Sequence, residues 1–328
     1  MPSSIPPQPL RLAPIDVPRI WGGTRFPAPA GGDPIGERWI YSTLPGQVSR
    51  IMGGAHDGWP IDVLCTTAPI DYLGAQLVQA GLHALPLLVK LVDTSQPLSV
   101  QVHPDDRLAH ASGLDQGKSE MWYVLSTTPE SFILLGLQDD TSPDALADAV
   151  RRDELPHLLN HITPQPGDFY HVPAGQIHAL GPGLLLLEVQ QPSDATYRLY
   201  DWARLDIHGK PRALDIPHAL EASSLTRYAV PKAHQQGTSH PIVHDPHFSV
   251  SLLPISITPT RMGIDGEAPY LLFCAEGSAM VQDLHTDLET HMEALDLLFV
   301  PAACQLTVST LANGTLLMVQ GPVEHFSD

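Results

Sequence analysis

The run GDFYHVPAGQIH, which ends at His178, constrains the fold more than any other stretch of this chain. Gly167 and Asp168 are typical of a tight turn between two strands. Pro173 and Gly175 favour a bend at the rim of a sheet, because proline removes a ladder donor and glycine permits a sharp change of direction. This spacing predicts that His178 enters the next strand with its side chain pointing inward.

A second run, LSVQVH, places Ser99, Gln101 and His103 at alternate positions of a predicted strand. Alternate side chains of a strand share a face, so three polar groups lie on one side of an apolar run. Further along the chain, Lys118 and Glu120 share a face in the same way. A half-buried strand also carries polar residues toward water, and an isolated Lys-x-Glu pair is usually such a solvated face. The alternation alone leaves both interpretations open.

Four side chains in these runs offer the ligand types of a divalent metal site: Gln101, His103, Glu120 and His178. Two imidazoles and a carboxylate suit zinc. The amide oxygen of Gln101 is neutral and would leave the ion more positive. The same ligands could hold iron, cobalt or manganese, because the order of affinities does not select among them. The sequence therefore predicts one divalent ion per chain, zinc in the first instance.

The composition narrows the fold class and the partners. Thirty-three prolines and 25 glycines, against only 16% charged residues, favour many short strands and turns over long helices. A formal net charge of −19 argues against a nucleic-acid partner, since no basic stripe is available to neutralise phosphates. A phosphorylated substrate would then have to be bound by a few local cations against an unfavourable overall field.

The cysteines and the apolar runs indicate the compartment. Cys65, Cys274 and Cys304 are far apart and form no Cys-x-x-Cys pair, which is typical of reduced core residues in a cytosolic protein. The first residues have no basic and apolar pattern of a secretory signal. No apolar run approaches the ~20 residues of a membrane span. We therefore expect a cytoplasmic protein without a membrane segment.

Several ordered motifs resemble those of the class I mannose-6-phosphate isomerases, in their short bacterial form, within the cupin superfamily. In chain order these motifs are WGG, IGERW, QVHPDD, GKSEMWYVL, HVPAGQIHAL and QQPSDATYRLYDW. The likeness covers most of residues 18–225, and the closing segment fits more loosely. It implies a small β-barrel that binds metal in its mouth. It also implies an enzyme that interconverts mannose 6-phosphate and fructose 6-phosphate through a cis-enediol.

The resemblance also implies roles for five polar residues. Arg198 is the arginine placed against the reacting sugar carbons, where with the metal it would stabilise the charge on O1 and O2. Asp194 is the candidate for ring opening or proton transfer. Lys90 would face the sugar, and Ser99 with Lys118 would hold the phosphate. Lys118 is also expected to be a catalytic residue, together with Arg198 and Asp194. The alternatives are a lysine on an edge strand for Lys90 and an arginine that ties a loop to the sheet for Arg198.

We expect a mainly β fold with two cupin-type β-barrel (jelly-roll) domains and a few short helices. Residues 1–230 form the expected catalytic, metal-binding domain, with a helical excursion near 142–160 that breaks before Pro156. A run with helix-like apolar spacing covers residues 70–81. Residues 231–328 form the expected C-terminal domain, a degenerate cupin-like β structure.

A second segment with a sequence pattern similar to that of the first motif predicts that the second domain lacks the metal ligand. Residues 294–306, ALDLLFVPAACQL, follow the pattern of the run that ends at His178. Aligning the two prolines puts Ala303 in the place of Gly175 and Leu306 in the place of His178. The second barrel is therefore expected to keep the bend and to lack the ligand.

Two other functions remain open from these residues. Two histidines and a carboxylate also form the facial triad of non-haem iron enzymes, so a cupin oxygenase is the first alternative. The amide of Gln101 and the cations Lys118 and Arg198 favour a polar, phosphorylated substrate instead. The second alternative is a non-catalytic sugar-binding cupin. We expect a small phosphorylated hexose as the partner, and a monomer or a homodimer.

Overall fold

A computed structural model describes residues 6–205, 210–231, 240–262, 268–310 and 314–322. The chain forms two compact units, each assembled from segments that are distant in sequence. The segments of the first, called the C-terminal unit, are Met1–Ile15, Ile40–Leu88 and Gln235–Asp328. Those of the second, called the motif unit, are Asp16–Trp39 and Val89–His234. These units are discontinuous, unlike the predicted spans 1–230 and 231–328, and the division of roles between two domains remains a prediction.

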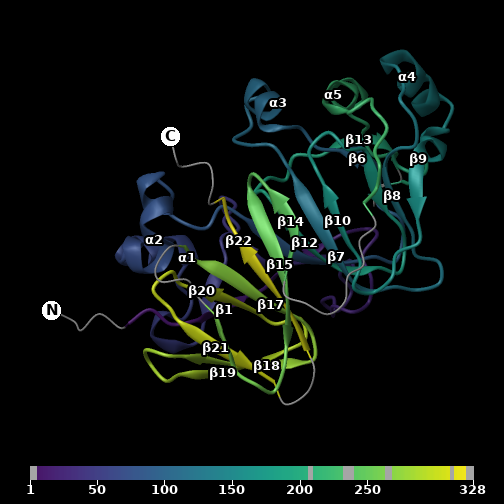
Figure 1. Ribbon diagram of the computed structural model, residues 1–328. Coiled ribbons are helices and arrows are strands. Elements are labelled where there is room, and N and C mark those ends of the chain that lie inside the picture. Colours follow the sequence, from purple (N-terminus) through teal and green to yellow (C-terminus); the bar gives the residue numbers. More distant parts are fainter. Residues whose placement is uncertain (1–5, 206–209, 232–239, 263–267, 311–313, 323–328) are drawn as a thin grey trace. The chain divides into compact units, whose positions relative to one another are not determined.

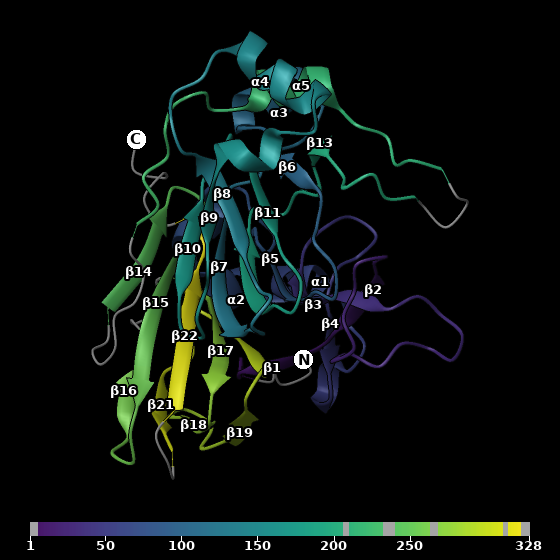
Figure 2. The same cartoon turned by 90° about the vertical axis from the view of Figure 1, so that its right-hand side faces the viewer.

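Two β-sheets build the motif unit (Figures 1 and 2). One has six strands, in the order β10 (Phe169–Val172), β7 (Glu120–Ser126), β12 (Leu185–Gln190), β5 (Leu88–Asp93), β3 (Ile35–Ser42) and β2 (Ile15–Pro18). The other has five strands, in the order β13 (Tyr197–Tyr200), β6 (Val100–Val102), β11 (His178–Leu180), β8 (Ile133–Leu137) and β9 (Leu159–Ile162).

The two sheets of the motif unit enclose a shared core. Trp122 and Val124 of β7 belong to one buried cluster with Ile133 and Leu135 of β8 and with Leu180 of β11. These strands come from different sheets, so their inner faces pack on each other as in a β-sandwich. Side chains alternate between the two faces of a strand, so each inward position can be identified from this cluster.

The helices are short. Their bounds are α1 (Ile61–Thr67), α2 (Pro69–Gln79), α3 (Asp106–Ala111), α4 (Pro143–Arg151) and α5 (Ile216–Ala222). The helix predicted over residues 70–81 is confirmed as α2, although Gly74 inside it has a non-helical backbone. Among the residues that the structure describes, no helix has the length and apolar character needed to cross a membrane.

The excursion near residues 142–160 is partly helical. Ser142 is the N-cap of α4, and its side chain accepts a hydrogen bond from the amide of Ala145. The α-helix ends at Arg151, and Pro156 lies in a separate 3₁₀ turn before β9. The helix is therefore shorter than predicted, because the apolar spacing past Arg151 belongs to a turn and a strand.

Helices α4 and α5 cover the outer face of the five-stranded sheet (Figure 2). Val100 and Val102 of β6 pack in one buried cluster with Leu146 of α4 and Ala219 of α5. Because Val100 and Val102 face the helices, Gln101 between them faces the interior of the sandwich. The polar face that the sequence predicts for this strand is thus the inner face.

The C-terminal unit also contains two sheets. The larger has seven strands, in the order β14 (His240–Asp245), β15 (Phe248–Ile255), β22 (Gly314–Gln320), β17 (Tyr270–Glu276), β20 (Leu297–Val300), β1 (Leu10–Ala13) and β4 (Arg50–Met52). The smaller has four, in the order β16 (Thr260–Met262), β21 (Leu306–Ser309), β18 (Ser278–Asp283) and β19 (Glu289–Glu293).

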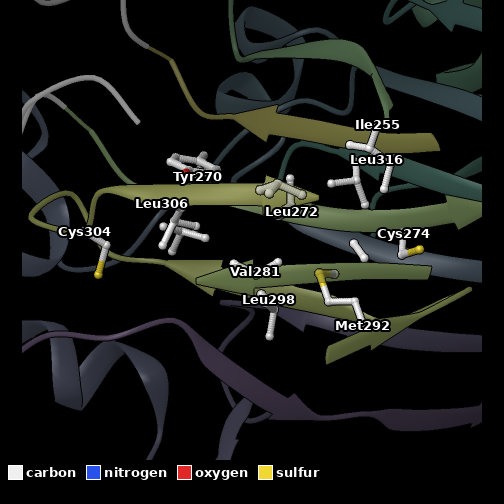
Figure 3. Close-up of a cluster of buried hydrophobic side chains, with 13 residues drawn as sticks. Ile255, Tyr270, Leu272, Cys274, Val281, Met292, Leu298, Cys304, Leu306 and Leu316 are labelled. Carbon is white, nitrogen blue, oxygen red and sulfur yellow. The ribbon is translucent and has the colours of Figure 1, made fainter. Parts of the chain in front are cut away.

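Apolar side chains from both of these sheets form one core (Figure 3). Leu272 and Leu298 come from the seven-stranded sheet, and Val281, Met292 and Leu306 come from the four-stranded sheet. The unit is therefore a second β-sandwich. A mainly β fold with two cupin-type barrels and a few short helices is confirmed.

Candidate metal centre

The bend after β10 positions two segments of the site at once. Gly175 has a φ of 88°, a backbone conformation that favours glycine. Its amide donates a hydrogen bond to the carbonyl oxygen of His103 at 2.9 Å, which ties the bend to the end of β6. A Cβ added at Gly175 would lie 3.2 Å from the carbonyl oxygen of Ala222. The predicted bend is therefore present, and it delivers His178 as the first residue of β11.

Strand pairing aligns three of the predicted site residues across the five-stranded sheet. Gln101 of β6 is the direct partner of His178 on one side and of Arg198 on the other. Residues that are directly opposite each other in a ladder project from the same face. Gln101 faces the interior of the sandwich, so His178 and Arg198 share that inner side.

His103, Glu120 and His178 converge in the interior, and each is only 1% exposed. One ligand atom from each of the three lies within 4.8 Å of the others. Each carboxylate oxygen of Glu120 lies 3.4 Å from the Nε2 atom of one histidine. Two ligands ~2.1 Å from a tetrahedral zinc lie about 3.4 Å apart. The spacing of these donors therefore fits a divalent metal.

Backbone carbonyl groups fix both imidazole rings. His103 Nδ1 donates to the carbonyl oxygen of Ala195 at 2.7 Å, and His178 Nδ1 donates to that of Gln176 at 2.9 Å. A carbonyl oxygen only accepts, so the proton of each neutral ring is on Nδ1. Each Nε2 atom then offers a lone pair toward Glu120, which is the usual arrangement of metal-binding histidines.

The electrostatics keep these ligands in their metal-binding protonation states. Burial, together with the ammonium of Lys118, lowers the pKa of His103 to about 3. Burial also lowers the pKa of His178. For Glu120 burial opposes ionisation, yet Lys118 and the two imidazoles hold its pKa well below the usual range. The cluster therefore consists of two neutral imidazoles and one carboxylate.

Gln101 lies beside this cluster, with its amide nitrogen 3.3 Å from His178 Nε2. Its Oε1 atom accepts a hydrogen bond from the Ser99 hydroxyl at 3.1 Å. Exchanging the two ends of the amide would turn the oxygen toward the cluster, and Ser99 could then accept from the nitrogen. Ser99 is 3% exposed and contacts Gln101, so its visible role is to orient that amide.

Charged groups alternate along the inner face of the six-stranded sheet. Lys118 Nζ lies 2.8 Å from Glu120 Oε2 and 3.6 Å from Glu188 Oε1. Lys90 Nζ lies 3.0 Å from the same Glu188 oxygen and 3.8 Å from Glu37 Oε2. All five residues are at most 7% exposed. Each buried charge therefore has an opposite charge beside it, as burial requires.

Lys90 is not on an edge strand, so that alternative is wrong. Its strand, β5, lies between β12 and β3 in the sheet. Burial opposes the charge of Lys90, but Glu188 and Glu37 raise its pKa above the usual value. For Glu37, burial is outweighed by Lys90 and Arg19, which hold its pKa at about 2. Lys90 is therefore a charged lysine in an interior ion pair.

Glu188 is a site residue that the sequence analysis missed. Burial and the nearby Glu120 raise the pKa of Glu188 to about 7, against the opposing effect of Lys90 and Lys118. The signal was present in the sequence, because a glutamate interrupts the apolar run LLLLEV just as Lys90 interrupts the run LPLLVKLV. A charge inside a buried strand needs a partner, and these two charges are partners.

Arg198 and Asp194 have different surroundings. Arg198 is half-buried on β13, and its Nη1 atom donates to the carbonyl oxygen of Ala213 at 3.1 Å. Burial, reinforced by Arg212, lowers the pKa of Arg198. Asp194 is exposed on the loop after β12, and within the described residues no contact of its side chain with the buried cluster is seen. Strand pairing thus places Arg198 opposite Gln101, whereas Asp194 lies on an exposed loop.

A cupin-type sandwich with two fixed imidazoles and a carboxylate in its interior defines a protein of the metal-dependent cupin class. Residues 21–133 match the family model of the type I phosphomannose isomerase catalytic domain. The mannose-6-phosphate isomerase ManA of Bacillus subtilis is 36% identical over 232 residues, which are 69% of this chain and 71% of that protein. The chain belongs to the mannose-6-phosphate isomerase family, as the motifs predict.

Other relatives and solved structures agree. The mannose-6-phosphate isomerase of Streptococcus mutans is 36% identical over 215 residues, 64% of this chain and 66% of that protein. The crystal structure of the Bacillus subtilis mannose 6-phosphate isomerase matches with a TM-score of 0.81 and 29% identity, covering 95% of this chain and 99% of that one. The prediction of an isomerase of this family is confirmed, and the alternatives of a cupin oxygenase and a non-catalytic sugar-binding cupin are not favoured.

Proposed function

We propose that this protein uses a divalent metal to interconvert mannose 6-phosphate and fructose 6-phosphate. The observation that carries the proposal is the convergence of His103 Nε2, His178 Nε2 and the Glu120 carboxylate inside a cupin-type sandwich. The curated relatives bear the name of this activity. A solved mannose 6-phosphate isomerase of the same fold, 17% identical, is described as zinc bound.

In this proposal the metal is zinc, held by His103, Glu120 and His178, with Gln101 as a fourth ligand through its amide oxygen. Zinc in such a site acts as a Lewis acid that stabilises negative charge on substrate oxygens. The hydrogen bonds from Nδ1 to the carbonyl oxygens of Ala195 and Gln176 orient the two rings. Ser99 holds Gln101, which supports the orienting role of this serine more directly than its predicted role at the phosphate.

Arg198 supplies positive charge where the enediol oxygens develop negative charge. Support comes from its pairing opposite Gln101 and from its half-buried position, where burial and Arg212 lower its pKa. A fixed cation at the reacting atoms stabilises the transition state more than it stabilises the neutral sugar. The predicted roles of Lys90 and Lys118 at the sugar and the phosphate remain predictions.

Glu188 is our candidate for moving the proton between C1 and C2. A general base works best when its pKa is near the operating pH, and the pKa of Glu188 is raised to about 7. Its carboxylate is buried beside Lys118, whereas Asp194, the candidate from the sequence, is exposed. Asp194 remains a prediction for ring opening.

Metal analysis combined with an isomerase assay tests the proposed function. Purified protein should contain about one divalent ion per chain and convert both hexose 6-phosphates. A chelator should abolish the conversion, and zinc should restore it. Full activity without metal would contradict the proposal, and oxygen consumption during turnover would support the oxygenase instead. We further propose a cytoplasmic location and a monomer or homodimer, which fractionation and light scattering would test.

A further inference from the structure

Lys118 and the proposed metal would use the same two atoms. Lys118 Nζ lies 2.8 Å from Glu120 Oε2 and donates to His103 Nε2 at 3.0 Å. An ammonium group has donors only, so this contact occupies the lone pair of His103 Nε2. One lone pair does not accept a hydrogen bond and bind a metal ion at the same time. Metal binding at His103 and Glu120 therefore requires the ammonium to leave.

A second carboxylate is within reach of the departing ammonium. Glu188 Oε1 lies 3.6 Å from Lys118 Nζ, and its strand, β12, is the neighbour of β7. The backbone of Lys118 is fixed by the bond from its amide to the carbonyl oxygen of Pro104 at 3.0 Å. A rotation of the side chain alone would carry the ammonium from Glu120 toward Glu188.

We propose that Lys118 and the divalent metal exchange at His103 and Glu120, so that metal binding transfers the Lys118 ammonium to Glu188. This inference rests on the proposed metal site. Before the exchange the ammonium neutralises the buried carboxylate of Glu120, and afterwards the metal does. The exchange thus avoids a buried charge without a partner, which would be strongly destabilising. It also makes the position of Lys118 depend on metal loading.

Zinc affinity and thermal stability of matched lysine variants test the exchange. Lys118→Met removes the competing ammonium and keeps a side chain of similar length. Lys90→Met is the control, because Lys90 is equally buried but forms its ion pairs with Glu188 and Glu37 rather than with Glu120 or His103. Removing a competing charged hydrogen bond should lower the zinc Kd of Lys118→Met by about tenfold. Lys90→Met should change the Kd much less.

The melting temperatures of the same variants, with and without zinc, provide a second test. Metal-free Lys118→Met should melt well below the metal-free wild type, because Glu120 loses its counter-charge. The zinc-loaded proteins should differ little, so zinc raises the Tm of Lys118→Met more than that of the wild type. Equal changes in zinc affinity for Lys118→Met and Lys90→Met would overturn the exchange, as would weaker zinc binding by Lys118→Met.

A measurement on the wild type keeps the inference testable if Lys118→Met does not fold. In protein labelled with ¹³C and ¹⁵N at lysine, zinc titration should shift the Lys118 side-chain signal strongly and the Lys90 signal weakly. A Lys118 side-chain signal that zinc does not shift would contradict the exchange. If zinc moves Lys118 but neither hexose phosphate is converted, the proposed function fails and the exchange stands. If zinc restores conversion while both lysines respond alike, the exchange alone fails.

Discussion

The two sandwiches of this protein have the same strand pairing around different interiors. In the motif unit, Glu120 begins β7 and pairs with Val172 of β10 and Gln190 of β12. In the C-terminal unit the first residue of β17 has the same two neighbours, a valine of β20 and a glutamine of β22. This residue is Tyr270, paired with Val300 and Gln320. Tyr270 therefore stands where the motif unit has its carboxylate.

The smaller sheets correspond in the same way. His178 of β11 pairs with Gln101 of β6, and Leu306 of β21 pairs with Met262 of β16. The predicted loss of the ligand at Leu306 is thus accompanied by the loss of the amide at Met262. Leu306 is fully buried in an apolar core (Figure 3). A tyrosine, a leucine and a methionine replace three of the four proposed ligands.

The correspondence extends to the charges around the site. Glu188 pairs with Trp122 across β12 and β7, and Met318 takes the matching position opposite Leu272. The five-stranded sheet also ends in β13, which carries Arg198, whereas the four-stranded sheet ends at β16. The backbone of a sandwich therefore does not require buried charges. The motif unit keeps them at an energetic cost, which indicates that they serve chemistry rather than folding.

Giving the motif unit the residue of its counterpart should have the largest effect. His178→Leu copies Leu306 and removes one proposed ligand, so we expect loss of bound metal and of isomerase activity together. Circular dichroism should show a folded protein, because the C-terminal unit buries leucine at the matching position. Metal analysis and turnover assays would check this. An active His178→Leu protein with no metal would show that the comparison has no bearing on catalysis.

Arg198→Ala removes the guanidinium that has no counterpart in the four-stranded sheet. We expect kcat to fall by about 10²–10³-fold, the range for loss of one preorganised donor to a developing oxyanion. Metal content should be unchanged, because Arg198 is not a proposed ligand. Arg198→Lys should recover part of the rate by restoring a cation at that position. Wild-type kcat in Arg198→Ala would contradict the enediolate role and favour the loop-tying alternative through Ala213.

Local patterns in the sequence predicted much of both units. Alternation in LSVQVH gave the inward face of Gln101, and the Pro-x-Gly spacing gave the bend before His178. The similar spacing that ends at Leu306 predicted an apolar residue in the position that corresponds to His178. Each of these depends on neighbours along the chain, where side-chain period and turn chemistry act directly.

Such local patterns do not predict which charged residues pair when they lie far apart in the sequence. Glu188 and Lys90 lie almost a hundred positions apart, and only strand order shows that β12 is the neighbour of β5. The role of Asp194 was implied by the family resemblance, and the residue lies on an exposed loop. The grouping of residues 40–88 with the C-terminal strands likewise depends on sheet contacts that no local pattern records.

The pH dependence of turnover should change on substitution of Glu188 and not on substitution of Met318, its counterpart in the C-terminal unit. Burial and Glu120 raise the pKa of Glu188 to about 7, and a protonated carboxyl group cannot act as a base. Metal at Glu120 and a closer Lys118 ammonium lower this pKa in the loaded enzyme, so we expect kcat/KM to fall in proportion to proton concentration on an acidic limb below pH 7. Glu188→Gln should lose most of the activity and this limb of the profile. Met318→Leu is the matched control and should leave the profile unchanged. An unaltered acidic limb in Glu188→Gln would assign the proton transfer to another group.

The smallest effect on catalysis is expected at Leu306, the counterpart of His178. Leu306→Ala removes a buried side chain from the apolar core and should lower the free energy of unfolding by about 2–5 kcal/mol. Metal content and kcat per folded molecule should remain those of the wild type, because no proposed ligand or substrate group lies in that core. Denaturant unfolding monitored together with activity would measure both. A fall in kcat or in bound metal would mean that the second sandwich contributes to the chemistry, and that the two interiors are not independent in function.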